Sequence, residues 1–301
     1  MLIAIDHGNI TCALSSGRVF VSGLAESDTR PPFGADTIRY NGKYYALSEQ
    51  RLPYLRDKTV DERFFVLTLF AIVSELKAAK QLGAHANISL AIGLPPSHFG
   101  SQHEKFKQYF LGRGVVEFKY NDTACSIEID DAMCFPQAIA AAMTVFDQIS
   151  GIRVMVIDIG GYTADYARMN AGQFDPKTYD SLEHGVIVLY NNITRKVNAD
   201  LDILLEESDI DRLLQGENGE YPPAVGDIVF NLAIAFVNDL ATMLRERGID
   251  LRFGNTVFVG GGAILLKDFL EVSEKFGSCV FVEDIAANAK GFALMYNAMR
   301  G

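Results

Sequence analysis

Short apolar runs that are rich in β-branched residues dominate the hydrophobic pattern of this chain and predict buried strands. The clearest run is Val154–Ile159, and a second strand is predicted over Thr163–Met169. Between them lies the turn Asp158-Ile159-Gly160-Gly161-Tyr162. The turn is so short that we expect the two strands to form a tight hairpin, with Asp158 at the end of its first strand.

The same design occurs at the N-terminus, where Leu2–Ile5 is followed by Asp6-His7-Gly8-Asn9. Asp6 and Asp158 are 152 positions apart, about half of the 301-residue chain. A repeat at this spacing predicts two similar lobes, each of which contributes one acid-and-glycine hairpin.

The rest of the first half mixes strands with strand–helix alternation, which is typical of an α/β lobe. The turn Asn41-Gly42 is a strong hairpin signal because both residues tolerate a positive φ. A polar segment, Arg51–Thr59, is predicted to be exposed. The expected elements are strands at Thr11–Leu14, Arg18–Gly23, Ile38–Tyr40, Tyr44–Leu47, Asn87–Gly93, Val115–Tyr120 and Ala124–Ile129, helices at Asp61–Gly83, His98–Leu111 and Pro136–Ile149, and a loop at Asp28–Gly34.

The second half alternates in the same way and contains the longest predicted helix, Gly226–Arg247, which has one apolar face. The other expected elements are loops at Tyr179–Gly185 and Gly216–Pro223, helices at Val186–Val197, Asp209–Leu214, from Ile264 and at Ile285–Met299, and strands at Leu201–Glu206, Thr256–Val259 and Cys279–Val282. We therefore expect an α/β fold throughout.

Composition narrows the functional classes. The hydrophobic fraction of 49% is sufficient for two packed domains. A net charge of −11 disfavours direct binding to nucleic acid or to an anionic membrane, and it favours a basic protein partner. The four scattered cysteines show no metal-ligand spacing, no apolar run reaches about 18 residues, and the N-terminus lacks a basic signal region. These features predict a cytoplasmic protein.

The glycine turns suggest anion binding, because a Cβ would prevent a phosphate from approaching the backbone amide groups. The carboxylates of Asp6 and Asp158 are placed to hold a hydrated Mg²⁺ beside that anion. A third glycine site, Gly260-Gly261-Gly262-Ala263, joins the strand Thr256–Val259 to a helix and exposes backbone that suits a ribose, a base or a phosphate. A simple tight turn is the alternative interpretation of that triplet.

These pieces, in this order, resemble the actin-like ATPase superfamily over essentially the whole chain, and most closely its plasmid-segregation members of the ParM type and their archaeal relatives. The resemblance implies a two-lobe, ribonuclease H-like α/β fold with a nucleotide cleft between the lobes. It implies one domain of residues 1–150 plus 285–301 and a second of residues 151–284. The motifs are the first phosphate loop Asp6–Thr11, the first hinge Phe135–Ala138, the second phosphate loop Asp158–Asp165, the adenosine motif Val259–Ala263 and the second hinge Ala286–Gly291.

Carried over by residue, the resemblance assigns ATP, or GTP, and Mg²⁺ as cofactors. Asp6 and Asp158 would hold the metal through water and take part in catalysis, and Gln137 would orient the attacking water. The nucleotide contacts are expected at Gly8, Asn9, Ile10, Thr11, Gly160, Gly161, Tyr162, Thr163, Gly260, Gly261, Gly262 and Ala263.

Two departures from the family pattern point to slow hydrolysis. The lysine that these proteins carry on the strand after the first loop is replaced by Ala13, so one cation on the phosphates is missing. The first hinge carries Gln137 where ParM-type proteins often have a glutamate, and an amide is a very poor general base.

Several polar residues allow competing interpretations. His7 is expected to face away from Asp6, because side chains alternate along a strand. Asp165 is either a second metal group or a residue paired within its own strand. Arg195 and Lys196 suit a solvated helix end better than a nucleotide contact. The segment Asn121-Asp122-Thr123 suits a hairpin turn better than a kinase acid, and His98 and His103 suit the surface better than a metal site.

Three functional hypotheses remain. The favoured one is a filament-forming ATPase that assembles head to tail and acts in plasmid DNA segregation through a basic DNA-bound adaptor, without binding nucleic acid or membrane itself. A small-molecule kinase would need a carboxylate base, and the expected hinge position carries Gln137. A chaperone or reactivating factor normally has a substrate-binding domain or a long insert, which 301 residues leave no room for.

Overall fold

A computed structural model of the protein describes residues 1–31, 34–217 and 219–301. The chain divides into two compact units, which are Met1–Thr144 with Ile285–Gly301 and Val145–Asp284. The loops expected at Asp28–Gly34 and Gly216–Pro223 include residues 32, 33 and 218, which lie outside the described residues.

The first unit is built on a nine-stranded mixed sheet in the order β3-β2-β1-β7-β9-β8-β5-β6-β4. Its strands are β1 (Leu2–His7), β2 (Thr11–Leu14), β3 (Val19–Val21), β4 (Leu24–Ser27), β5 (Thr37–Tyr40), β6 (Lys43–Leu47), β7 (His85–Leu94), β8 (Val115–Tyr120) and β9 (Thr123–Pro136). Its helical segments are the 3-10 turn η1 (Lys58–Val60), α1 (Glu62–Ala78), α2 (Pro96–Leu111), α3 (Ile139–Ala142) and α10 (Ala287–Arg300).

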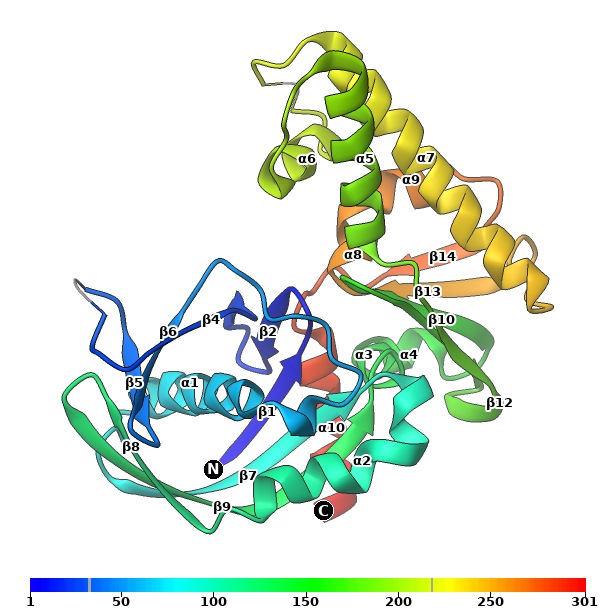
Figure 1. Cartoon of the computed structure of the whole chain (residues 1–301). Helices are drawn as coiled ribbons and strands as arrows, with labels where there is room; N and C mark the ends of the chain where they lie inside the picture. The colour runs from blue at the N-terminus through cyan, green and yellow to red at the C-terminus, as the bar shows by residue number, and fades with distance from the viewer. Residues whose placement is uncertain (32–33, 218) are drawn as a thin grey trace. The chain divides into compact units, whose positions relative to one another are not determined.

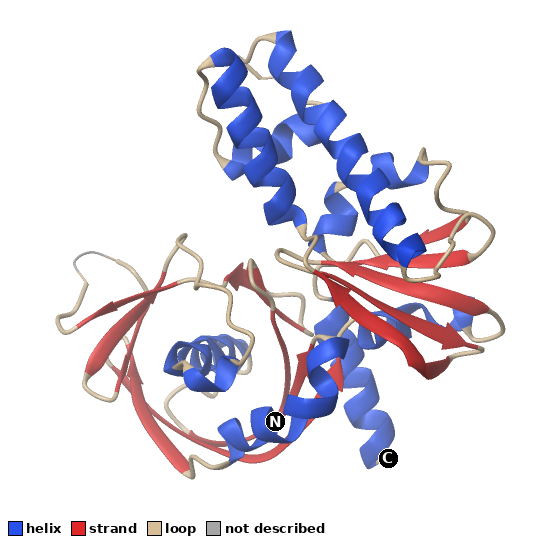
Figure 2. Cartoon of the chain, turned by 45° about the vertical axis from the view of Figure 1, so that its right-hand side comes forward, coloured by secondary structure: helices blue, strands red, loops and turns tan. Residues whose placement is uncertain are grey.

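The alternation of side chains along β1 sorts these helices onto two faces of the sheet. Ile3 and Ile5 belong to the large apolar core that contains α1, whereas Ala4 belongs to a smaller cluster with Phe292 of α10. Figure 2 shows the strands curving around α1, and Figure 1 shows α10 beside β1 and β7. Small residues on the second face allow α10 to approach closely.

The second unit is built on a five-stranded sheet in the order β12-β11-β10-β13-β14. Its strands are β10 (Arg153–Ile159), β11 (Ala164–Asn170), β12 (Gln173–Leu182), β13 (Asn255–Val259) and β14 (Ser278–Phe281). Its helices are α4 (Phe146–Ile149), α5 (Val186–Leu201), α6 (Glu207–Leu214), α7 (Pro223–Glu246), α8 (Gly261–Leu265) and α9 (Lys267–Glu271). A 3-10 turn η2 (Met143–Val145) precedes α4 and contains the boundary between the two units in the sequence. The long helices α5 and α7 pack against each other, as Figure 1 shows.

Parallel pairing brings distant motifs to a common sheet edge in each unit. In the first, β7 pairs in parallel with both β1 and β9, so the chain after Asp6 and the chain after Pro136 leave the same edge. In the second, β10 pairs in parallel with β13, and Asp158 lies opposite Val259. The carboxyl ends of parallel strands are where α/β proteins usually bind ligands.

Most predicted elements are confirmed, but three are wrong. The helix expected over Pro136–Ile149 is broken, because Phe135 and Pro136 continue β9 beside β7 and only α3, η2 and α4 follow. The loop expected at Tyr179–Gly185 is largely strand, because β12 extends to Leu182 at the edge of its sheet. The strand expected at Leu201–Glu206 is irregular chain after α5.

The prediction that Arg51–Thr59 is exposed is also wrong in part. Leu52 packs into the core of the first unit, and Lys58 is buried with only 7% of its surface exposed. A charged residue buried in a polar segment has to be held by specific partners.

One described helix, α7, is long and apolar enough to cross a membrane by length and composition, with a mean hydropathy of 1.5. The core helix of a soluble protein passes the same test. Seven apolar residues of α7 are buried within the second unit, namely Val225, Val229, Ala233, Phe236, Val237, Leu240 and Leu244.

Candidate functional site

The first phosphate-loop candidate is the turn between β1 and β2. Asp6 lies opposite Ala13 in this antiparallel pair, and Gly8–Ile10 form the turn. A Cβ built on Gly8 would lie 2.5 Å from the carbonyl oxygen of Thr11. Only glycine therefore fits this position without moving the backbone.

Asp6 is nearly buried and is the centre of a polar network. The Gln137 amide donates from Nε2 to Asp6 Oδ1 over 2.5 Å, and the Asn288 side chain makes a second hydrogen bond to Asp6. Burial raises the pKa of the Asp6 carboxyl, while the positive charge of Lys58 and the two hydrogen bonds act in the opposite direction. The ionised carboxylate thus costs free energy in the empty protein, and a bound cation would offset that cost.

The residue after Gln137 is strained. Ala138 has φ 62° and ψ −59°, and the amide of Ile139 donates to the carbonyl of Gln137 over 2.6 Å, which closes a three-residue γ-turn. Asn288 Oδ1 accepts from the Ala138 amide over 3.0 Å and holds this turn in place. One side chain of α10 therefore fixes both Asp6 and the segment that carries Gln137. Strain of this kind persists only where neighbouring contacts impose it.

Replacing Asp6 by asparagine should stabilise the protein at pH 7 in buffer that contains neither nucleotide nor divalent metal. Because the pKa is raised, folding favours the neutral carboxyl. Asp6 therefore contributes to the stability of the folded protein at low pH, and this contribution is lost as pH rises through the folded pKa. Asparagine keeps a neutral side chain at every pH. We expect a higher Tm for Asp6→Asn at pH 7, by roughly 2–4 °C for each kcal/mol regained.

The advantage of Asp6→Asn should shrink as pH falls toward the ordinary aspartate pKa of about 3.9. Thermal unfolding of both proteins across this range checks the sign. Asp130→Asn, on an exposed position of the same unit, is the matched control. A wild-type protein that is at least as stable as Asp6→Asn at pH 7 would contradict this account.

Residues outside the first loop donate hydrogen bonds to its carbonyl groups. Lys58 Nζ donates to the carbonyl of His7, Ser22 Oγ donates to that of Gly8 over 2.6 Å, and the Ser22 amide donates to Ile10 over 2.9 Å. An anion site must present N–H groups rather than carbonyl oxygens. Bonds that fix the carbonyl oxygens also fix the amide groups of the same peptide planes.

His7 itself belongs to the core, as the strand alternation predicts. Its ring stacks on Phe110, and its Nε2 is 2.8 Å from the Thr68 hydroxyl oxygen. Thr68 donates to the carbonyl of Phe64, so His7 Nε2 is the donor and Nδ1 is left unprotonated and without a partner. Burial, aided by the charge of Lys58, lowers the pKa of His7 to about 3, so the ring is neutral.

The second phosphate-loop candidate is the turn between β10 and β11. The amides of Gly185, Val186 and Ile187, at the start of α5, donate to the carbonyls of Tyr162, Gly160 and Gly161 over 3.0–3.1 Å. Gly185 is required here, because a Cβ would lie 2.2 Å from the Gly161 oxygen. As in the first loop, external donors fix the carbonyl groups.

Asp158 and the glycine triplet form one local arrangement. Gly260 has φ 90°, and a Cβ built on it would lie 2.2 Å from Asp158 Oδ1. The carboxylate of the second loop therefore rests directly on the first glycine of the triplet. Gly262 packs with equal closeness against Ile159 and Val186. The glycines at 260 and 262 thus allow this turn to pack closely against Asp158, Ile159 and Val186.

The remaining polar candidates have ordinary local partners. Asp165 is buried and accepts hydrogen bonds from Ser181 and from Thr163, which supports pairing within its own sheet. Arg195 donates to Asn192, and Lys196 pairs with Asp200 on the same helix. Among residues 1–31, 34–217 and 219–301, no group of three or more His, Cys, Asp or Glu is arranged to hold a metal ion.

The Asn121-Asp122-Thr123 segment forms the β8–β9 turn, as predicted, with Asn121 at φ 52°. Asp122 pairs with Arg30 on the surface. His103 bonds the carbonyl of Phe99 on its own helix.

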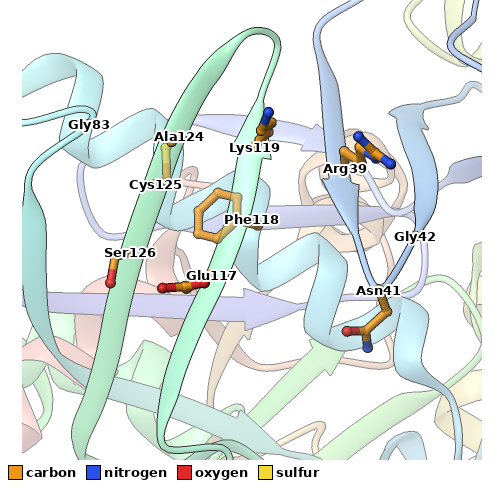
Figure 3. Close-up of a pocket in the computed structure, with 10 residues that line it drawn as sticks. All are labelled: Arg39, Asn41, Gly42, Gly83, Glu117, Phe118, Lys119, Ala124, Cys125 and Ser126. Carbon is orange, nitrogen blue, oxygen red and sulfur yellow. The ribbon is translucent and has the colours of Figure 1, made fainter.

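A pocket of about 520 Å³ lies elsewhere on the first unit, between the β5–β6 turn and β8 with β9 (Figure 3). It opens because β5 and β8 pair only at Ile38–Tyr120 and Arg39–Lys119. None of the site residues predicted from sequence lines it. The candidate site and this pocket are therefore separate features.

Sequence reasoning missed Lys58, Ser22 and Asn288. Lys58 and Ser22 act on the first loop from elements 51 and 14 residues away. Asn288 lies within a segment that was assigned only as a hinge, and its contacts to Asp6 and Ala138 depend on α10 packing. The available signal in the sequence was the glycine at position 291. It marks the place where α10 packs so closely that a Cβ would lie 1.8 Å from the Ala140 oxygen.

Two strand-end acid-and-glycine loops, each within its own α/β unit, define the class of protein to which this chain is similar. A family model described as "Actin like proteins N terminal domain" matches residues 4–139. A second, "Archaeal actin homologue MreB-like, C-terminal", matches residues 156–272. The chain belongs to the actin-like superfamily.

Solved structures of low sequence identity share the fold over its full length. Native Ta0583, an archaeal actin homologue, is 19% identical with a TM-score of 0.77 and covers 100% of this chain and 99% of its own. A subunit of a 15-stranded ParM filament from Clostridium botulinum is 18% identical with a TM-score of 0.73 and 99% coverage of both chains. Bacillus thuringiensis ParM with ATP is 14% identical, has a TM-score of 0.69, and covers 99% of this chain and 98% of its own.

Ta0583 has also been solved in complex with ADP. Because these structures match over the full length of the chain, the two sheets with their helices form the α/β actin-like fold. A search of curated proteins finds no match.

Proposed function

We propose that this protein is a nucleotide-dependent, filament-forming ATPase. The observation that carries the proposal is the paired design of the two loops: each places one buried aspartate and a glycine turn at the carboxyl edge of parallel strands, with its carbonyl groups held from outside. Relatives with the same fold have been solved with ATP, with ADP and as filaments.

The ligand of these residues is a nucleotide, ATP or alternatively GTP. The amide groups of residues 8–11 and 161–163 take the phosphates, and residues 260–263 take the adenosine. The Gly160 amide donates to the Thr163 carbonyl over 2.8 Å, so Gly160 contributes through its missing Cβ alone. Asp6 and Asp158 suit Mg²⁺, which prefers carboxylates and retains several waters, so no cage of protein ligands is needed.

Hydrolysis depends on Gln137. Its Nε2 is committed to Asp6, so its Oε1 is the atom that accepts a hydrogen bond from the attacking water. An amide orients water without taking its proton, which makes turnover slow. A glutamate at this position has no donor for Asp6, so glutamine is matched to the carboxylate beside it.

Assembly is head to tail, because heterologous contacts that do not close into a ring produce open helical filaments. The partner in DNA segregation is a basic adaptor bound to plasmid DNA, since a net charge of −11 disfavours direct contact with DNA. Adaptor affinity should fall as salt rises, and a binding titration at 50 and 300 mM salt measures this. An affinity that does not change with salt would exclude an electrostatic adaptor.

Light scattering of the purified protein with and without ATP–Mg²⁺ separates this function from the alternatives. A filament-forming ATPase should give a rise in scattering that depends on the nucleotide. A small-molecule kinase or a monomeric chaperone of the same fold would show no change in scattering on addition of nucleotide, and that outcome would reject the proposal.

A further inference from the structure

Lys58 is a buried cation that serves the first phosphate loop. It lies in η1, ahead of α1, and only 7% of its surface is exposed. Its Nζ donates to the carbonyl of His7, one residue after Asp6. Its charge acts on Asp6, His7 and Cys12, which surround the start of the loop.

Neighbouring residues fix the position of Lys58. The side chain of Asp57 caps η1 by accepting from the Thr59 amide over 3.0 Å, and Lys105 pairs with Asp57 over 2.5 Å. Lys58 Nζ also lies 5.6 Å from the centre of the Phe64 ring, within cation–π range. The His7 carbonyl and the Phe64 ring thus hold the lysine side chain beside the loop, and the Asp57 cap fixes the turn that carries it.

Burying a lysine is expensive unless its charge is used. Lys58 donates a hydrogen bond to the His7 carbonyl, and its charge attracts Asp6. The site retains a positive group beside a turn whose geometry requires glycine.

We propose that Lys58 supplies the cation for the nucleotide phosphates that the strand after this loop lacks. That strand carries Ala13 opposite Asp6 and has no lysine or arginine before Arg18. A lysine delivered from η1 compensates for the missing side chain, and it does so while holding the His7 carbonyl away from the anion. The inference rests on the proposed nucleotide-dependent function and assigns a phosphate-binding residue to it.

The test measures binding rather than turnover, with ATP–Mg²⁺ titrated directly and adenosine by competition. Lys58→Met removes both the charge and the hydrogen-bond donor at similar length, whereas Lys58→Gln removes the charge and retains a donor. Lys119→Gln, at an exposed position of β8, is the matched control. Thermal unfolding of each variant without nucleotide reports on folding.

Both Lys58 variants should bind ATP–Mg²⁺ about 10–100-fold more weakly, the range expected for one charged hydrogen bond. Adenosine affinity should change less than about twofold, and Lys119→Gln should match the wild type. If Lys58→Met does not fold, the milder Lys58→Gln carries the test.

An equal loss for adenosine and ATP would show that Lys58 only supports the fold and would overturn the inference. Wild-type ATP affinity in a folded Lys58→Gln protein would overturn it as well. A wild-type protein that binds no nucleotide would instead reject the proposed function, and the inference with it. The wild-type titration therefore distinguishes the two failures.

Discussion

Replacing Asp158 by alanine should reduce phosphate release by about 10³-fold while nucleotide binding weakens far less, because removal of a single preorganised electrostatic group costs roughly 10²–10³ in turnover. Asp158 ends β10 and rests on Gly260, where a carboxylate can hold a hydrated metal beside the second loop. The loop amides remain in the variant and continue to bind phosphate. Measuring phosphate release and nucleotide affinity on the same preparation tests whether turnover falls far more than binding does.

Two further variants serve as controls for this experiment. Asp158→Asn keeps the shape over Gly260 and should lose turnover almost as fully as alanine, since an amide is a poor Mg²⁺ ligand. Asp180→Ala, on an exposed position of β12, should leave hydrolysis unchanged. If a folded Asp158→Ala protein hydrolyses ATP at the wild-type rate, the metal assignment is wrong.

Loss of the Gln137 side chain should slow phosphate release by about 10²-fold, a typical scale for a positioning group in proton-transfer chemistry. Gln137 contacts Asp6 directly and precedes the strained Ala138 turn, so its amide is held in one orientation. Nucleotide affinity should be preserved in Gln137→Ala. Filaments should last longer, because disassembly follows hydrolysis.

Gln108→Ala on the exposed face of α2 is the control, and it should match the wild type in both rate and filament lifetime. Gln137→Glu should not accelerate hydrolysis, because a carboxylate beside Asp6 loses the hydrogen bond and adds repulsion. Unchanged phosphate release in Gln137→Ala would assign the water to another residue.

Local patterns were sufficient to predict the loops but not their environment. An apolar run that ends in Asp and Gly is readable from a few residues, and both Asp6 and Asp158 lie at such strand ends. Periodicity failed after Pro136, where the apolar Ile139–Ala142 suggested a longer helix. Parallel pairing of β9 with β7 and the γ-turn at Ala138 are tertiary effects that no local pattern reveals.

The polar character of two segments led to wrong predictions from the sequence. β12 was partly missed because an edge strand with two polar faces shows no alternation of burial. Lys58 was expected at the surface because its neighbours are polar. Its burial is set by the His7 carbonyl, 51 residues away, and by the Phe64 ring. Long-range partners of this kind determine which polar residues of a segment are functional.

The central claim is that nucleotide controls assembly, and sedimentation of the protein over a range of concentrations tests it most directly. With ATP–Mg²⁺ we expect a critical concentration, above which all added protein appears in the pellet, and a return to the supernatant after hydrolysis. Without nucleotide the protein should remain in the supernatant throughout. Protein that stays in the supernatant well into the tens of micromolar with either ATP or GTP would contradict the account.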